Sequence, residues 1–112
     1  MNKATVWQFS LWNAQRISSK FYECSNLLAD LNPDVFCITE TWLQQGQYID
    51  YDSYKVFRND RIGQQGGGVA ILIKAGIRPL KVKRSQGGSN VEWLAVLLDQ
   101  KGKAPIWLVC VY

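Results

Sequence analysis

The sequence of 112 residues contains no histidine. Histidine is the side chain that most often acts as a general base near neutral pH, and it is also a common ligand of metal ions. A hydrolytic reaction that depends on histidine therefore cannot be completed by these residues alone.

Cysteine is also scarce, and the start of the chain has no continuous apolar run. The three cysteines, Cys24, Cys37 and Cys110, are odd in number, have no CxxC spacing and lie among apolar residues. This pattern predicts buried, reduced thiols, which are typical of nuclear or cytoplasmic proteins. Gln8 and Ser10 interrupt the apolar residues near the N-terminus, so we expect no secretion signal and no membrane span.

The overall composition is that of a folded domain with a mild positive charge. Apolar residues make up 47% of the chain and charged residues 20%, and 112 residues are enough for one domain with a modest core. Five tryptophans indicate a densely packed core or an aromatic surface for a partner. The net charge of +4 fits an anionic partner such as nucleic acid, although many ordinary proteins share it.

The order of apolar patterns predicts a mixed α/β fold. Residues 5–13 are rich in β-branched and aromatic side chains and predict a strand, while residues 16–31 show the apolar period of a helix. Pro33 ends this helix, and residues 35–39 predict a strand that is buried on both faces. Residues 44–53 are polar and predict a loop. Further strands are expected at residues 54–57, 69–73, 77–83, 91–98 and 106–112.

The first two predicted strands flank a helix, so we expect them to be parallel. In open sheets of this kind, ligands collect at the carboxyl ends of the strands. Asn13 ends the first predicted strand and Glu40 follows the second. The two side chains should therefore lie near one another, although they are far apart in the sequence.

Four stretches, in chain order, carry a family resemblance: LWNAQRI (11–17), LNPDVFCITETWL (31–43), YKVFRNDRIGQQGGGVAILIK (54–74) and VCVY (109–112). Together they resemble the endonuclease/exonuclease/phosphatase superfamily, and more narrowly the apurinic-type endonuclease domain at the front of non-LTR retrotransposon polyproteins. The match runs over essentially the whole sequence but covers only the N-terminal half of such a domain. The resemblance implies a four-layer α/β sandwich truncated to its N-terminal half, with residues 1–112 as the N-terminal portion of a single domain.

The resemblance also implies a reaction, which is hydrolysis of a phosphodiester with Mg²⁺, or with Mn²⁺ in its place. Glu40 matches the glutamate that binds the metal, and Asn13 matches the asparagine beside it near the scissile phosphate. Tyr112 matches a tyrosine whose hydroxyl approaches that phosphate. Without the resemblance, Glu40 is a solvated carboxylate at a strand end, Asn13 is a turn residue and Tyr112 is a core or edge tyrosine.

The remaining catalytic residues of the family lie in its C-terminal half, beyond the position of Tyr112. They are an Asp-x-Asn, a further Asp and an Asp-His pair. Since loss of members of a catalytic unit costs many orders of magnitude in rate, we expect that the 112 residues alone do not cleave DNA. The implied partners are DNA, as the target of nicking, and a reverse transcriptase domain on the parent polyprotein.

Several other residues have two interpretations. Arg58 and Arg61 are predicted to contact DNA phosphates or to order the adjacent loop, with Asp60 as an ion-pair partner; the alternative is that they are plain surface charges. The glycine triplet 66–68 lacks the pattern of a phosphate loop, so a hairpin turn is favoured. Trp42 and Trp93 could stack on a base, but core packing is favoured.

Other functions also fit the sequence. An abasic-site repair endonuclease or a phosphoesterase of the same superfamily is one alternative. A second is a non-enzymatic remnant that binds nucleic acid through a salt-dependent basic surface. A third is a non-functional gene fragment that does not fold stably, because half a sandwich leaves its core uncovered.

Overall fold

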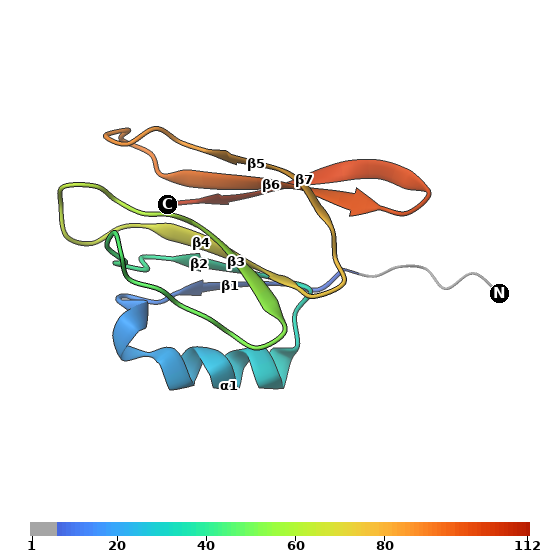
Figure 1. Ribbon diagram of the computed structural model, residues 1–112, viewed down its shortest axis with the longest axis horizontal. Helices are drawn as coiled ribbons and strands as arrows, with labels where there is room; N and C mark the ends of the chain where they lie inside the picture. The colour runs from blue at the N-terminus through green and yellow to red at the C-terminus, as the bar shows by residue number, and fades with distance from the viewer. Residues whose placement is uncertain (1–6) are drawn as a thin grey trace.

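The computed structural model describes residues 7–112, which form a helical layer and two β-sheets (Figure 1). The elements in chain order are β1 (Phe9–Asn13), the short 3-10 helix η1 (Ile17–Ser19), α1 (Phe21–Leu31), β2 (Val35–Thr39), β3 (Tyr54–Asn59), β4 (Val69–Lys74), β5 (Pro79–Arg84), β6 (Trp93–Gln100) and β7 (Lys103–Val111). The predicted α/β class is therefore confirmed. Thr5 and Val6, with which the first strand was expected to begin, lie outside the described residues.

The first sheet has the strand order β1-β2-β4-β3. β1 and β2 are parallel, with Asn13 opposite Thr39, as the strand–helix–strand pattern predicted. β4 is antiparallel to both β2 and β3. The apolar runs of β2 and β4 are almost wholly buried because α1 lies against one face of this sheet and the second sheet against the other (Figure 1).

The helix is shorter than the sequence predicted, since α1 begins at Phe21 and not at residue 16. Gln15 and Arg16 have φ angles of 45° and 79°, and a right-handed helix cannot contain such left-handed residues. Cys24 and Leu28 lie in the core, as the apolar period predicted. Phe21, the first residue of the helix, is 42% exposed and stacks against the ring of Tyr51.

The second sheet has the order β5-β6-β7, and both of its strand pairs are antiparallel. The three strands confirm those expected at residues 77–83, 91–98 and 106–112, with bounds that differ by a few residues. Leu94, Val96 and Leu98 point from β6 toward the first sheet and are fully buried. They join Val35, Ile71 and their neighbours in the core between the sheets.

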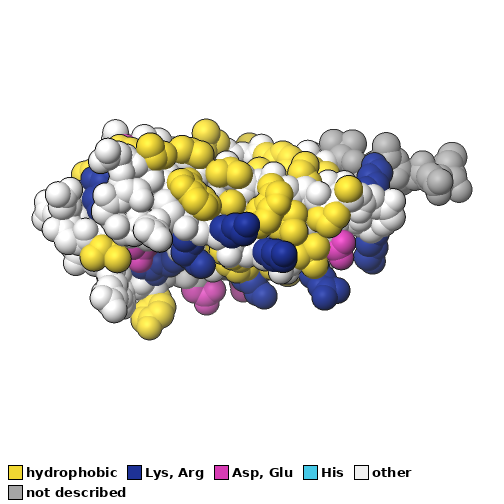
Figure 2. Space-filling view, turned by 90° about the horizontal axis from the view of Figure 1, so that it is seen from above, with side chains coloured by type: hydrophobic (Ala, Val, Ile, Leu, Met, Phe, Trp, Pro, Cys, Tyr) yellow, Lys and Arg dark blue, Asp and Glu magenta, His cyan; other side chains and the backbone are white. Residues whose placement is uncertain are grey.

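The opposite face of the second sheet is exposed. Trp107, Val109 and Val111 of β7 are 41%, 51% and 56% exposed. Figure 2 shows hydrophobic side chains spread over this side of the molecule, with lysine and arginine side chains among them. Of the four layers implied by the family resemblance, residues 7–112 form three, in the order helix, sheet, sheet.

Two further expectations concern the thiols and the membrane. Cys24, Cys37 and Cys110 are buried and free, which confirms the prediction of reduced core thiols. Among the described residues, no helix is long and apolar enough to cross a membrane.

Candidate functional site

Asn13 and Glu40 lie at the same end of the first sheet. Asn13 is the last residue of β1 and pairs with Thr39, the last residue of β2, so Glu40 follows directly beside it. The backbone N–H groups of Ala14 and Arg16 donate to the carbonyls of Thr39 and Glu40, at 2.9 and 3.0 Å. The predicted proximity of Asn13 and Glu40 is therefore confirmed.

Glu40 turns the chain sharply out of the sheet, because its φ angle of 54° is left-handed. A residue with a β-carbon in this conformation costs about 1–2 kcal/mol, which neighbouring contacts have to offset. Two such contacts follow at once: Thr41 N–H donates to Gly68 O at 3.2 Å, and Trp42 N–H donates to Gly67 O at 2.9 Å. Gly67 and Gly68, which precede β4, thus fix the backbone of Thr41 and Trp42, the two residues after Glu40.

The carboxylate of Glu40 is surrounded by groups that favour its charged form. Hydrogen bonding from the Asn13 amide is the largest cause that lowers the pKa of Glu40, followed by hydrogen bonding from Tyr112. The Trp42 side chain and the positive charge of Arg61 lower this pKa further. Glu40 is therefore an ionised carboxylate at neutral pH, and its oxygens are available to a cation.

Tyr112 reaches the same place from the second sheet, directly after β7. Its backbone N–H donates to Glu92 O at 2.8 Å, and Glu92 N–H donates to Tyr112 O at 3.2 Å. The hydrogen bond with Glu40 is the largest cause that raises the pKa of Tyr112. Its phenol therefore stays protonated near neutral pH and acts as a hydrogen-bond donor to the Glu40 carboxylate.

Glu92 connects Tyr112, Arg61 and Gly68 at the site. The sequence did not predict this role. Its carboxylate accepts from Arg61 Nε at 2.8 Å and from the Gly68 N–H at 2.7 Å, while its backbone pairs with Tyr112. Since Gly68 O in turn accepts from Thr41, Glu92 links Tyr112 in the second sheet to the Glu40 turn in the first. The available signal was a carboxylate in the apolar stretch VEWLAVLL. Such a residue at a strand start is usually solvated.

The glycine triplet at 66–68 has a packing role at the site. β3 and β4 form the predicted antiparallel pair, and residues 60–68 connect them. A β-carbon on Gly68 would collide with Thr41 Oγ1, and one on Gly67 would collide with the Arg61 guanidinium. Both glycines also have positive φ angles, of 86° and 64° respectively. Only glycine allows this close approach to the Glu40 turn.

The two arginines predicted to contact DNA are engaged in ion pairs. Arg58 pairs with Asp60 at 2.7 Å and also donates to the carbonyls of Gln44 and Gln47. Arg61 pairs with Glu92 at 2.5 Å and lies near enough to Glu40 to lower its pKa. Contact of either arginine with DNA stays a prediction.

The preference for core packing at Trp42 is wrong, because its side chain is 40% exposed. Trp42 follows the Glu40 turn and has a left-handed φ angle of 54°, so its side chain lies beside the carboxylate and not in the sheet core. Trp93, the other tryptophan considered for stacking, begins β6 and is half-buried.

Comparison with known proteins identifies the family of the chain. The sequence profile of the Endonuclease/Exonuclease/phosphatase family matches residues 11–110. The chain belongs to this family. A comparison with curated proteins finds no significant match.

Solved structures show the same fold. An AP endonuclease from Leishmania major has a TM-score of 0.74 at 19% identity, covering 95% of this chain and 40% of its own. The 3′ phosphatase NExo from Neisseria, bound to a product DNA hairpin, has a TM-score of 0.69 at 19% identity, covering 83% and 38%. TDP2 from D. rerio, in complex with a single-strand DNA product, has a TM-score of 0.67 at 18% identity, covering 90% and 43%. The chain thus spans about two fifths of the length of these family structures.

The site offers some, but not all, of the oxygen ligands that a hard cation such as Mg²⁺ needs. Within residues 7–112, no group of three or more histidine, cysteine, aspartate or glutamate side chains is placed to bind a metal. Glu40 and Asn13 nevertheless offer a charged and a neutral oxygen at one position. Mg²⁺ retains several waters and binds proteins through one or two carboxylates together with substrate phosphates. Glu40 and Asn13 fit one corner of such a site.

Proposed function

We propose that the chain is the N-terminal part of a divalent-metal-dependent DNA endonuclease that cleaves phosphodiester bonds. The observation that carries the proposal is the convergence of Asn13 and Tyr112, which come from two different sheets, on the ionised carboxylate of Glu40. Membership of the endonuclease/exonuclease/phosphatase family supports the reaction class.

Glu40 and Asn13 are the residues that would bind Mg²⁺, or Mn²⁺ in its place. The bound ion would polarise a phosphoryl oxygen and favour a hydroxide nucleophile. Hydrogen bonds from Asn13 and Tyr112 lower the pKa of Glu40, so the carboxylate would stay ionised, and able to bind a cation, to a more acidic pH than an ordinary glutamate.

The other side chains at the site orient the carboxylate and attract a phosphate. The Tyr112 hydroxyl interacts with Glu40, and it would be a neutral hydrogen-bond donor beside a phosphate bound there. Arg61 contributes positive charge beside both groups, while its ion pair with Glu92 fixes the guanidinium in place. Fixed donors of this kind stabilise negative charge as it develops on phosphate oxygens.

The finer assignment is to the target-site nicking endonuclease of a non-LTR retrotransposon. It is supported by the stretches ITETWL and RNDRIGQQGGGVAI, which resemble that subgroup. DNA as the partner is supported by the net charge of +4 and by the DNA-bound state of two of the similar structures. A reverse transcriptase domain on the same polyprotein, and action in the nucleus or cytoplasm, belong to this proposal.

The 112 residues are expected to bind metal and DNA without cleaving DNA, because the site contains one available carboxylate and the sequence has no histidine base. The test is nicking of supercoiled plasmid with Mg²⁺ by the purified chain, compared with Glu40→Ala. We expect no nicking above buffer by either protein. Nicking that requires Glu40 would overturn the proposed inactivity while supporting the catalytic assignment.

DNA binding is tested separately by a filter-binding titration of a duplex oligonucleotide at two salt concentrations. We expect binding at low salt that weakens as salt rises, because contacts to phosphates release counterions. No binding at low salt would contradict DNA as the partner.

A further inference from the structure

A cavity of about 350 Å³ opens beside the Glu40 turn. It is formed by the segment before α1, the chain that follows β2 and the glycine segment before β4. The lining side chains that matter for its chemistry are Arg16, Trp42, Gln44, Gln47, Gln64 and Gln65. A cation, an indole ring and four amides thus face one space.

No carboxylate lines this cavity, and its cation is available. Arg16 is exposed and takes part in neither of the two ion pairs found within residues 7–112. The neighbouring cavity between residues 59–64 and 85–92 is different, because Asp60 and Glu92 line it and its cation, Arg61, is paired with Glu92. Of these two cavities, the one at Trp42 therefore has the charge that favours an anionic ligand.

Two residues that line the cavity, Arg16 and Trp42, are tied to Glu40 of the candidate metal site. The Arg16 N–H donates to Glu40 O at 3.0 Å, which fixes the backbone of the cation relative to Glu40. Trp42 lies two residues beyond Glu40, and its side chain is one of the groups that lower the pKa of that carboxylate. A ligand in the cavity would therefore lie next to a phosphate bound at Glu40.

The side chains suit a nucleotide in particular. Base–aromatic stacking is sequence-tolerant because every base has a π-face, and an indole 40% exposed offers a surface for it. Arginine pairs with phosphates or with base edges, and glutamine amides both donate and accept hydrogen bonds to bases. Gln47 Oε1 already accepts from the Gln44 N–H at 2.7 Å, which orders this side of the cavity.

We propose that this cavity binds the nucleotide adjacent to the phosphate at Glu40, with the base stacked on Trp42 and Arg16 as its cationic contact. The inference rests on the proposed function, since it requires DNA at Glu40. It adds a subsite for the base next to the cleaved bond, in which the glutamine amides, and not the stacking itself, would set a preference among bases.

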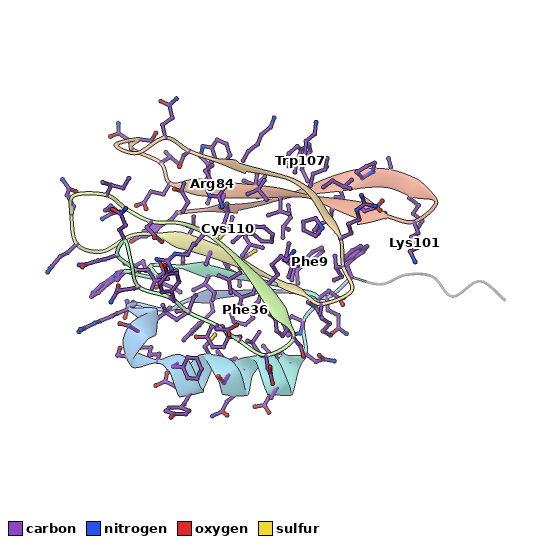
Figure 3. All side chains as sticks on the ribbon, viewed as in Figure 1. Phe9, Phe36, Arg84, Lys101, Trp107 and Cys110 are labelled. Carbon is purple, nitrogen blue, oxygen red and sulfur yellow. The ribbon has the colours of Figure 1, made fainter. Side chains whose placement is uncertain are left out.

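The test is the affinity of the 112-residue chain for a short fluorescent single-stranded oligonucleotide, whose bases are free to stack on an indole, measured by anisotropy at low salt with Ca²⁺. Trp42→Ala is compared with Trp107→Ala, a matched control because the two rings are 40% and 41% exposed and Trp107 lies on the outer face of the second sheet (Figure 3). Loss of base stacking should weaken binding by about 5- to 150-fold for Trp42→Ala. Trp107→Ala should change it less than about twofold. Equal effects of the two substitutions would overturn the proposal.

Arg16→Gln provides a second variant whose exposed side chain lies outside the core, so that a folding defect in Trp42→Ala leaves the proposal testable. It should weaken binding and lower the salt slope by about one unit, as expected for one lost ionic contact. An unchanged slope and affinity would contradict the role of Arg16. If the unmodified chain binds no DNA, the proposed function fails. If it binds DNA but is insensitive to both variants, only the subsite is refuted.

Discussion

The two sheets differ in how far the described chain covers them. The first sheet lies between α1 and the second sheet, and five of the six residues in β4 are buried. The second sheet is covered on one face only, and β7 leaves Trp107, Val109 and Val111 exposed on the other. Glu40 stands on the covered sheet and Tyr112 on the half-covered one, so the geometry of the site depends on how the sheets are joined.

Glu92 is the residue that joins them at the site. It belongs to the segment before β6, yet its carboxylate accepts from the Gly68 N–H of the first sheet's connection. The structure therefore predicts that substitutions in the core and at this junction have different effects. Substitutions in the covered core should unfold the chain, whereas substitutions at this junction should loosen the site more than the fold.

The largest expected effect comes from the covered sheet. Phe36 of β2 is 1% exposed and packs between the first sheet and α1 (Figure 3). Phe36→Ala should lower the free energy of unfolding by about 3–5 kcal/mol. Trp107→Ala, on the exposed face, should lower it by about 1 kcal/mol or less, including loss of the Lys83 cation–π contact. Urea denaturation measures both, and equal losses would mean that the two sheets are covered to the same extent.

The second prediction concerns the connection before β4. Gly68→Ala should lower the free energy of unfolding by about 2–4 kcal/mol, since its β-carbon would be left-handed and would strike the buried Thr41. Gly46→Ala is the control: its φ angle is similar, at 88°, but nothing lies within 4 Å of the added carbon. It should cost only about 1–2 kcal/mol of conformational strain. Thermal melts that rank Gly46→Ala as the more damaging change would refute the steric account.

The third prediction tests the junction itself. Glu92→Gln removes the charge that pairs with Arg61 and should lower the free energy of unfolding by about 1–2 kcal/mol. Asp60→Asn breaks the ion pair with Arg58, and neither of these residues is among the groups that shift the pKa of Glu40. We expect Glu92→Gln, and not Asp60→Asn, to shift the backbone amide resonances of Thr41 and Tyr112. Matching spectra for the two variants would show that Glu92 does not connect the sheets at the site.

The smallest effect is electrostatic and concerns the pKa of Glu40. Its folded-state pKa is lowered, so the stability it contributes is present above its unfolded pKa and is lost as the pH falls through the folded value. Asn13→Ala should raise this pKa toward its ordinary value, and more than Tyr112→Phe, because the Asn13 hydrogen bond is the larger cause. An NMR titration of the Glu40 side-chain carboxyl carbon measures the pKa of Glu40 in each variant. A larger rise of this pKa in Tyr112→Phe than in Asn13→Ala would contradict the prediction.

Much of the fold could be predicted because the apolar period and the strand–helix–strand order are visible along the sequence. β2, the parallel β1–β2 pair and the approach of Asn13 to Glu40 all follow from them. The start of α1 could not be predicted, because Gln15 and Arg16 adopt left-handed φ angles. The Arg16 N–H also donates to Glu40 O, a contact that is made only in the folded chain.

Site residues could be predicted only where the residue type and its place at a strand end indicate a function. Glu40 and Asn13 are recognisable at strand ends, but Glu92 acts through partners 24 and 31 residues away, Gly68 and Arg61. The exposure of Trp42 likewise depends on its left-handed backbone and on the glycines beside it. Such roles arise from tertiary contacts, which neither spacing nor composition reveals.

The central claim is that Glu40 and Asn13 form one corner of a divalent-metal site, and paramagnetic broadening by Mn²⁺ in ¹H–¹⁵N spectra tests it most directly. Small additions of Mn²⁺ should first broaden the Asn13 side-chain amide and the backbone amide of Thr41. Glu40→Gln should abolish this broadening, while Asp52→Asn, at an exposed carboxylate elsewhere, should leave it unchanged. Broadening centred on other carboxylates, or indifferent to Glu40→Gln, would contradict the account.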